Sequence, residues 1–188
     1  MLLVGCSDET KEDELYDLLL VCFDDYYLSQ KISASDTLQA FEDYLISEGH
    51  LENNSGESYL ELLNYLKNNT YLKLPLKKID FSNALLYTNP SDLLFCAHDN
   101  FNIDSSAFLT LDYYNCADQI AQMIEANESI DIHQMFDIYA KCLDKDEIVK
   151  PFVRESMLQF FYRWYFTSKY NREMALPLEE SVEALESV

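Results

Sequence analysis

Apolar residues recur along most of the chain at the three- and four-residue spacing of an α-helix. The first such run predicts an amphipathic helix over residues 11–29, because its apolar side chains fall on one stripe of a helix surface. This stripe contains Leu15, Leu18, Leu19, Cys22, Phe23, Tyr26 and Tyr27. No apolar run reaches the length of about 18 residues needed to cross a bilayer.

A second helix is predicted over residues 36–48. Asp36 and Gln39 form a capping-box pattern, in which two side chains hydrogen-bond to backbone groups at a helix N-terminus. Gly49 stands where this helix should end, because glycine is common just past the last helical turn.

Helical spacing resumes after Ser58 and is then interrupted. Ser58 and Glu61 form another capping-box pattern, and apolar residues follow on one face at Tyr59, Leu62, Leu63 and Leu66. The periodicity fails over residues 71–87, where leucines alternate around Pro75. Because proline lacks the N–H that a central strand needs, this segment is predicted to be an irregular connection or a small two-stranded element.

Three more helices are predicted before residue 144. Proline at the first helical position marks a short helix that starts at Asn89-Pro90. A second apolar stripe predicts a helix over residues 106–127, and it contains Leu109, Tyr113, Cys116, Ala117, Ile120 and Ile124. Asp131 and Gln134 form a third capping-box pattern, followed by Met135, Phe136, Tyr139, Ala140 and Leu143.

The last predicted helix begins near Pro151 and includes the most aromatic segment of the chain. Residues 160–166 are apolar on nearly every side of a helix, so Trp164 is expected in the core. Few glycines are available for hairpin turns, and no alternation of apolar and polar residues is sustained. We therefore expect an all-α fold, a single compact bundle of about six to seven helices.

Composition supports a folded chain and excludes several partners. Of its 188 residues, 48% are hydrophobic and 14% aromatic, well above a disordered composition. A net charge of −21 repels the phosphates of nucleic acids and anionic lipid surfaces. The spacing of Gly5, Gly49 and Gly56 fits neither a dinucleotide-binding fingerprint nor a P-loop. We expect no nucleic-acid partner and no cofactor.

The N-terminal residues contain a motif that indicates where in the cell the protein is located. Leu3-Val4-Gly5-Cys6 places a leucine, a branched residue, a glycine and a cysteine in direct succession, and acidic residues follow. The motif resembles the lipobox of bacterial lipoproteins, and Ser7-Asp8-Glu9 is similar to the acidic surface-export tag of Bacteroidota lipoproteins. The resemblance implies cleavage before Cys6, lipidation of its sulfur and a place at the outer membrane or cell surface.

The segment before Cys6 is shorter than a complete signal peptide. Such a peptide needs a basic region and about 7 to 15 apolar residues, whereas five residues precede Cys6. We expect a start upstream of Met1; otherwise Cys6 is an ordinary thiol of a cytoplasmic protein. On the lipoprotein interpretation, residues 1–14 are a signal remnant, lipidation site and acidic tether, residues 15–171 the helical domain, and residues 172–188 an acidic tail.

Histidine patterns do not indicate catalysis or a zinc site. His50, His98 and His133 each lack the nearby Cys or His partners that zinc ligands have, and each is expected at the surface or beside a helix cap. His133 falls opposite the apolar stripe of its helix, which favours exposure to solvent. No nucleophile motif occurs, so we assign no catalytic residue.

Two acidic patterns have alternative interpretations. An oxygen-rich segment could supply calcium ligands, but the glycine and terminal glutamate of an EF-hand are missing, so turn formation is preferred. It comprises Asp99, Asn100, Asn102 and Asp104. The acid pairs Asp24-Asp25 and Asp146-Glu147 are expected on solvated helix surfaces. No metal ligand is assigned.

Four cysteines besides Cys6 are expected to be buried thiols, because no two lie within the short loops of a disulfide framework. They are Cys22, Cys96, Cys116 and Cys142. The alternative, in an oxidising envelope compartment, is two disulfides in any of three connectivities.

Uneven charge can steer a partner, but helical proteins with mixed charges often have it, and tyrosine serves both cores and interfaces, so neither feature by itself indicates a binding surface. Residues 1–66 contain two lysines and fifteen acidic residues, whereas residues 141–172 have a net charge of +3. We expect an envelope-anchored, non-catalytic module that binds or scaffolds another envelope protein, with Cys6 as its membrane anchor. The alternatives are an acidic immunity-type inhibitor of a basic toxin and an enzyme of an unfamiliar kind.

Overall fold

The computed structural model describes residues 9–29, 31–68, 90–126 and 132–174, and every regular element within these ranges is helical. The predicted all-α class is confirmed. The connection expected over residues 71–87 lies outside the described residues.

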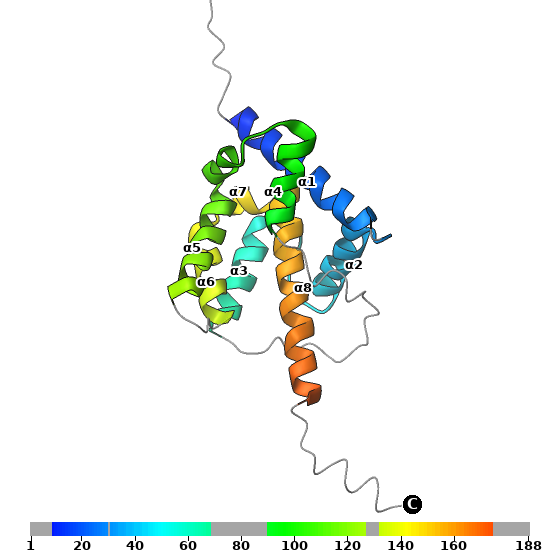
Figure 1. Cartoon of the computed structure of the whole chain (residues 1–188). Coiled ribbons are helices and arrows are strands. Elements are labelled where there is room, and N and C mark those ends of the chain that lie inside the picture. Colours follow the sequence, from blue (N-terminus) through cyan, green and yellow to red (C-terminus); the bar gives the residue numbers. More distant parts are fainter. Residues whose placement is uncertain (1–8, 30, 69–89, 127–131, 175–188) are drawn as a thin grey trace, which may run out of the picture.

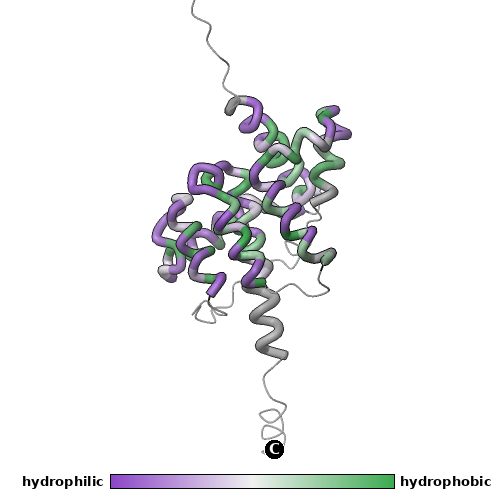
Figure 2. Tube along the Cα trace, turned by 90° about the vertical axis from the view of Figure 1, so that its left-hand side faces the viewer, coloured by the Kyte–Doolittle hydropathy of each residue, from purple (hydrophilic) through white to green (hydrophobic). Residues whose placement is uncertain are grey.

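Eight α-helices and one 3-10 helix form a single bundle in the described part of the chain (Figure 1). They are α1 (Glu9–Ser29), α2 (Ala34–Ser47), α3 (Gly56–Leu66), α4 (Pro90–Phe101), η2 (Ser105–Thr110), α5 (Asp112–Ala126), α6 (Ile132–Cys142), α7 (Lys145–Ile148) and α8 (Pro151–Met174). In Figure 2 most helices alternate between hydrophobic and hydrophilic residues, as expected when one stripe faces the core.

The first and last described helices extend beyond the boundaries that the sequence indicated. α1 begins at Glu9, so residues 9–14 of the expected tether form its first turns. Glu12 is fixed there by an ion pair with Lys150, whose Nζ lies 2.6 Å from its Oε1. α8 continues to Met174, past the expected boundary at residue 171.

The N-caps of α2 and α3 each lie three residues before the predicted cap. Ser33 is the N-cap of α2 and donates its hydroxyl to the Asp36 carboxylate at 2.7 Å, so Asp36 lies inside the first turn. Ser55 caps α3, and its side chain accepts the N–H of Ser58. The capping boxes predicted at Asp36 and Ser58 are wrong, because a serine one turn upstream takes the cap position in both helices.

The helix predicted over residues 106–127 is divided in two. Leu111 has an extended backbone with φ −78° and ψ 135°, which separates η2 from α5. Because a 3-10 helix has three residues per turn, Leu109 no longer shares the apolar stripe of α5, and its side chain is exposed. Leu111 is buried instead.

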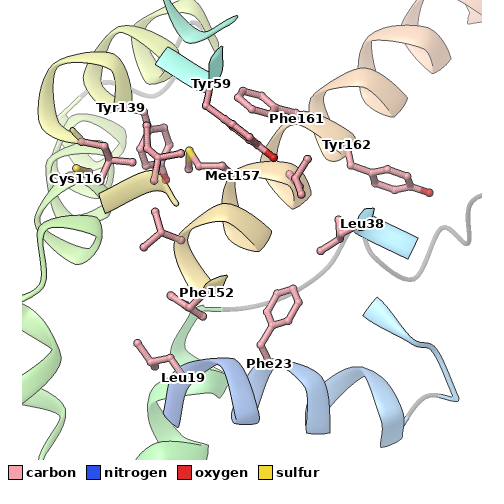
Figure 3. Packing of buried hydrophobic residues seen from close by; sticks show 14 of the residues in the cluster. Leu19, Phe23, Leu38, Tyr59, Cys116, Tyr139, Phe152, Met157, Phe161 and Tyr162 are labelled. Atoms are coloured by element: carbon pink, nitrogen blue, oxygen red, sulfur yellow. The ribbon is translucent and has the colours of Figure 1, made fainter. Parts of the chain in front are cut away.

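The aromatic segment of α8 lies in the core, as predicted. α8 packs against α1, α2 and α7, and Figure 3 shows Phe152 beside Leu19 and Phe23 of α1. Trp164 is 6% exposed, and its ring centroid lies 5.5 Å from that of Phe136. The aromatic rings thus link α8 to helices on several sides of the bundle.

Two disulfides replace the expected buried thiols. Cys22 of α1 is bonded to Cys96 of α4, and Cys116 of α5 is bonded to Cys142 of α6. The prediction of thiols is wrong because short sequence spacing is not required when two helices pack side by side. α1 packs on α4 and α5 packs on α6, which brings each pair of Cα atoms to 5.8 Å.

Among the described helices, none combines the length and the apolar character that crossing a bilayer requires.

Candidate functional site

The α2–α3 corner forms a surface groove, and its shape begins with Gly49. Gly49 has φ +76°, a backbone conformation that favours glycine, and it ends α2 as the sequence predicts. The N–H of Gly49 donates to the carbonyl of Ile46, and that of His50 donates to the carbonyl of Leu45 at 2.8 Å. These two bonds constitute a Schellman motif, which turns the chain sharply after α2.

Ser58 holds the returning chain against α3. Its hydroxyl oxygen accepts the N–H of Glu52 at 2.8 Å, while its own N–H donates to Ser55. Leu51 is buried between these anchors and is 1% exposed. The segment between α2 and α3 is therefore fixed by backbone hydrogen bonds and by one buried side chain.

Gly56 fixes the same corner against α7. A Cβ atom at Gly56 would lie 1.9 Å from the carbonyl oxygen of Lys145, so only glycine permits this approach. This close contact between α3 and α7 fixes the N-terminus of α3 beside the groove.

The groove has a volume of about 640 Å³ and lies between the turn and one face of α3. Ser58, Glu61, Leu62 and Tyr65 of α3 line one side, because residues three, four and seven apart share a helix face. The turn supplies the other side through Gly49, His50, Leu51 and Glu52. The sequence did not reveal this site. The signal that could have indicated it is Tyr65, a large aromatic residue that falls beside the apolar stripe of α3.

His50 is half-buried at the edge of this groove. Its Nε2 is buried and has no hydrogen-bond partner among the described residues. Burial lowers the pKa of His50, and the nearby Glu48 carboxylate opposes this only in part. The imidazole is therefore neutral at physiological pH and adds no positive charge to the groove.

The other two histidines lie away from the groove. His98 is exposed as expected, with Nδ1 2.9 Å from the Asp99 carboxylate. The exposure predicted for His133 is wrong, because its ring is half-buried and Nδ1 donates to the carbonyl of Leu66 at 2.7 Å. This bond satisfies a carbonyl at the C-terminus of α3.

Two glutamates are buried inside the bundle, and the sequence did not predict the burial of either one. Glu147, expected on a solvated surface, is 6% exposed; its carboxylate accepts the hydroxyl of Tyr16 and pairs with Lys150 at 2.8 Å. Glu42 is fully buried and accepts the hydroxyl of Tyr59 at 2.5 Å. Each charge is tolerated because hydrogen bonds and a nearby cation compensate for lost hydration.

An acidic cluster connects α1, α2 and α8 through Asp24, Ser35 and Glu155. The hydroxyl of Ser35 lies 2.9 Å from the carboxylates of both Asp24 and Glu155, although it can donate to only one at a time. Burial raises the pKa of Glu155, and the negative charge of Asp24 adds to this effect. Asp24 and Glu155, like Glu42 and Glu147, have hydrogen-bond partners inside the fold and are therefore assigned a structural role.

The oxygen-rich segment considered for calcium is divided between two elements. Asp99 and Asn100 belong to α4, Asn102 adopts a left-handed backbone with φ 55°, and Asp104 caps η2 by accepting the N–H of Ser106 at 2.8 Å. This bond lowers the pKa of Asp104. No cluster able to hold a metal ion occurs among the described residues.

Exposed charge is strongly acidic over the described part of the domain. Of the residues whose exposure the structure describes, fifteen acids and four lysines are exposed. Lys150 and Arg154, from the segment with a net positive charge, are instead partly buried and pair with Glu147 and Glu42. These two basic side chains are thus paired with carboxylates inside the fold.

Cys6, Ser7 and Asp8 of the lipobox and export tag lie outside the described residues. Glu9 belongs to the first turn of α1. No protein-family model, curated protein or solved structure matches this chain.

Proposed function

We propose that this chain is a lipid-anchored protein of the bacterial envelope, attached through Cys6, and that its helical domain is a non-catalytic module that binds or scaffolds another envelope component. The two disulfides are the observation that favours this location most strongly. Disulfides persist in oxidising compartments, whereas cytoplasmic thiols are kept reduced. With four cysteines paired, Cys6 is the remaining cysteine of the chain and stands in the lipobox-like motif.

The buried acidic groups support a non-catalytic role. Both oxygens of Glu147 have partners, Tyr16 and Lys150, and those of Glu42 have Tyr59 and Gln39. Carboxylates with this many internal partners stabilise the folded state and are not presented to a substrate.

Metabolic labelling tests the anchor. The protein expressed from its natural gene in its own host should incorporate a fatty-acid analogue and sediment with membranes, because several acyl chains anchor more stably than one. Cys6→Ala should abolish labelling and release the protein into the soluble fraction. The matched control is Cys22→Ala/Cys96→Ala, which removes two cysteines inside the domain and should leave labelling intact.

Absence of label on the wild-type protein, or equal labelling of Cys6→Ala, would contradict the proposal. Cys6 would then be an ordinary thiol.

A second candidate function, neutralisation of a basic toxin, is favoured by the excess of exposed acids. An immunity-type inhibitor should bind one cationic protein tightly and in a fixed ratio, whereas a scaffold should co-purify with an envelope assembly. Affinity capture followed by isothermal titration calorimetry separates the two.

A further inference from the structure

The α2–α3 groove has a negative rim. Glu52 and Glu61 are both exposed, and neither forms an ion pair with a described basic side chain. Among the residues that the structure describes, no lysine or arginine lines the groove. The neutral imidazole of His50 leaves this charge uncompensated, so the groove favours a cationic group over a neutral or anionic one.

An aromatic side chain stands beside these carboxylates. Tyr65 is 42% exposed, whereas Leu51 and Leu62 are 1% and 3% exposed and support the groove from inside the core. Glu61 and Tyr65 are four residues apart and therefore lie one above the other on α3. A carboxylate beside an exposed aromatic ring suits a group that is both planar and positively charged.

The shape of the groove is established before any partner binds. The Schellman motif at Gly49, the bonds to Ser58 and the contact between Gly56 and Lys145 all fix the backbone. A preformed groove lowers the entropic cost of binding.

We propose that this groove binds an arginine side chain presented by a segment of a cationic partner protein. A guanidinium is planar, stacks on aromatic rings such as that of Tyr65, and donates to carboxylates such as those of Glu52 and Glu61 through several N–H groups. A lysine ammonium is more strongly hydrated and does not stack in this way. The inference rests on the proposed binding role of the acidic domain and assigns that role to one site.

Fluorescence anisotropy with labelled hexa-arginine tests this assignment on the full chain at low ionic strength. Glu52→Gln/Glu61→Gln should weaken binding at least tenfold. Asp17→Asn/Asp25→Asn, on exposed positions of α1, makes the same change in net charge and should weaken binding less than threefold. Hexa-lysine should bind several-fold more weakly than hexa-arginine, and Tyr65→Ala should remove that preference.

Nuclear magnetic resonance locates the site independently. Titration with N-acetyl-arginine amide should shift backbone amides of residues 49–52 and 58–65 and leave those of α5 unchanged. If the two double variants lose affinity equally, or if amide shifts spread over the surface, the groove assignment is overturned while a diffuse acidic binding surface remains. If the wild-type chain does not bind hexa-arginine at all, recognition of a cationic partner is overturned as well. Lipidation at Cys6 is independent of all these outcomes.

Discussion

Breaking the Cys22–Cys96 disulfide should destabilise the domain more than breaking Cys116–Cys142. The first bond joins residues 74 apart in the sequence and the second joins residues 26 apart. A crosslink removes conformational entropy from the unfolded chain in proportion to the logarithm of the loop length, which gives about 4.5 kcal/mol for the longer loop and about 3.5 kcal/mol for the shorter. Total stabilities of domains this size are about 5 to 15 kcal/mol, so either loss should be easily measured.

The measurement is equilibrium unfolding in urea, followed by circular dichroism, on two double variants. Cys116→Ala/Cys142→Ala retains only the longer loop, and Cys22→Ala/Cys96→Ala retains only the shorter. Each variant is unfolded with and without a reductant, so that the same side chains are compared before and after one bond is broken. The reductant should lower the free energy of unfolding by about 4.5 kcal/mol in the first variant and by about 3.5 kcal/mol in the second.

Alkylation provides the control. Before reduction, an unfolded wild-type chain should expose no reactive thiol at these four positions. Reactive thiols there, or a change on reduction below about 1 kcal/mol in both variants, would refute the argument from loop closure.

Three further substitutions test the packing and charge of the domain. Trp164→Ala should lower the free energy of unfolding by about 3 to 5 kcal/mol in urea titration, through lost burial and a residual cavity; a loss below about 1 kcal/mol would place the ring at the surface. Gly56→Ala should destabilise by about 1 to 3 kcal/mol in thermal unfolding, although alanine favours helices, because its Cβ would meet the backbone of Lys145; a raised melting temperature would contradict this. Burial raises the pKa of Glu155 above its ordinary value of 4.5. The protonated carboxyl group therefore favours the folded state below that value, and this contribution to stability is lost as the pH rises through the folded-state pKa. Glu155→Gln should therefore be more stable than wild type near pH 7, and the difference should disappear below about pH 4; a difference independent of pH would contradict this.

The sequence alone determined the class of fold and most of the helices. Spacing of apolar residues is a local property, because residues three and four apart always share a helix face. The end of α2 at Gly49 was likewise predictable, since a positive φ is a demand of the backbone at one position. The burial of Trp164 followed from a segment that has no polar face.

Tertiary structure decided the pairing of cysteines, the burial of charge and the groove. Cys22 meets Cys96 only because α1 packs on α4, and sequence spacing contains no information about which helices become neighbours. Glu147 is buried because folding brings Tyr16, 131 residues away in the sequence, to one carboxylate oxygen, while Lys150 of the next turn pairs with the other. The groove likewise needs the turn after α2 to lie opposite one face of α3, where the Ser58 hydroxyl accepts the N–H of Glu52. Such features depend on long-range contacts, and these exist only after the helices have packed.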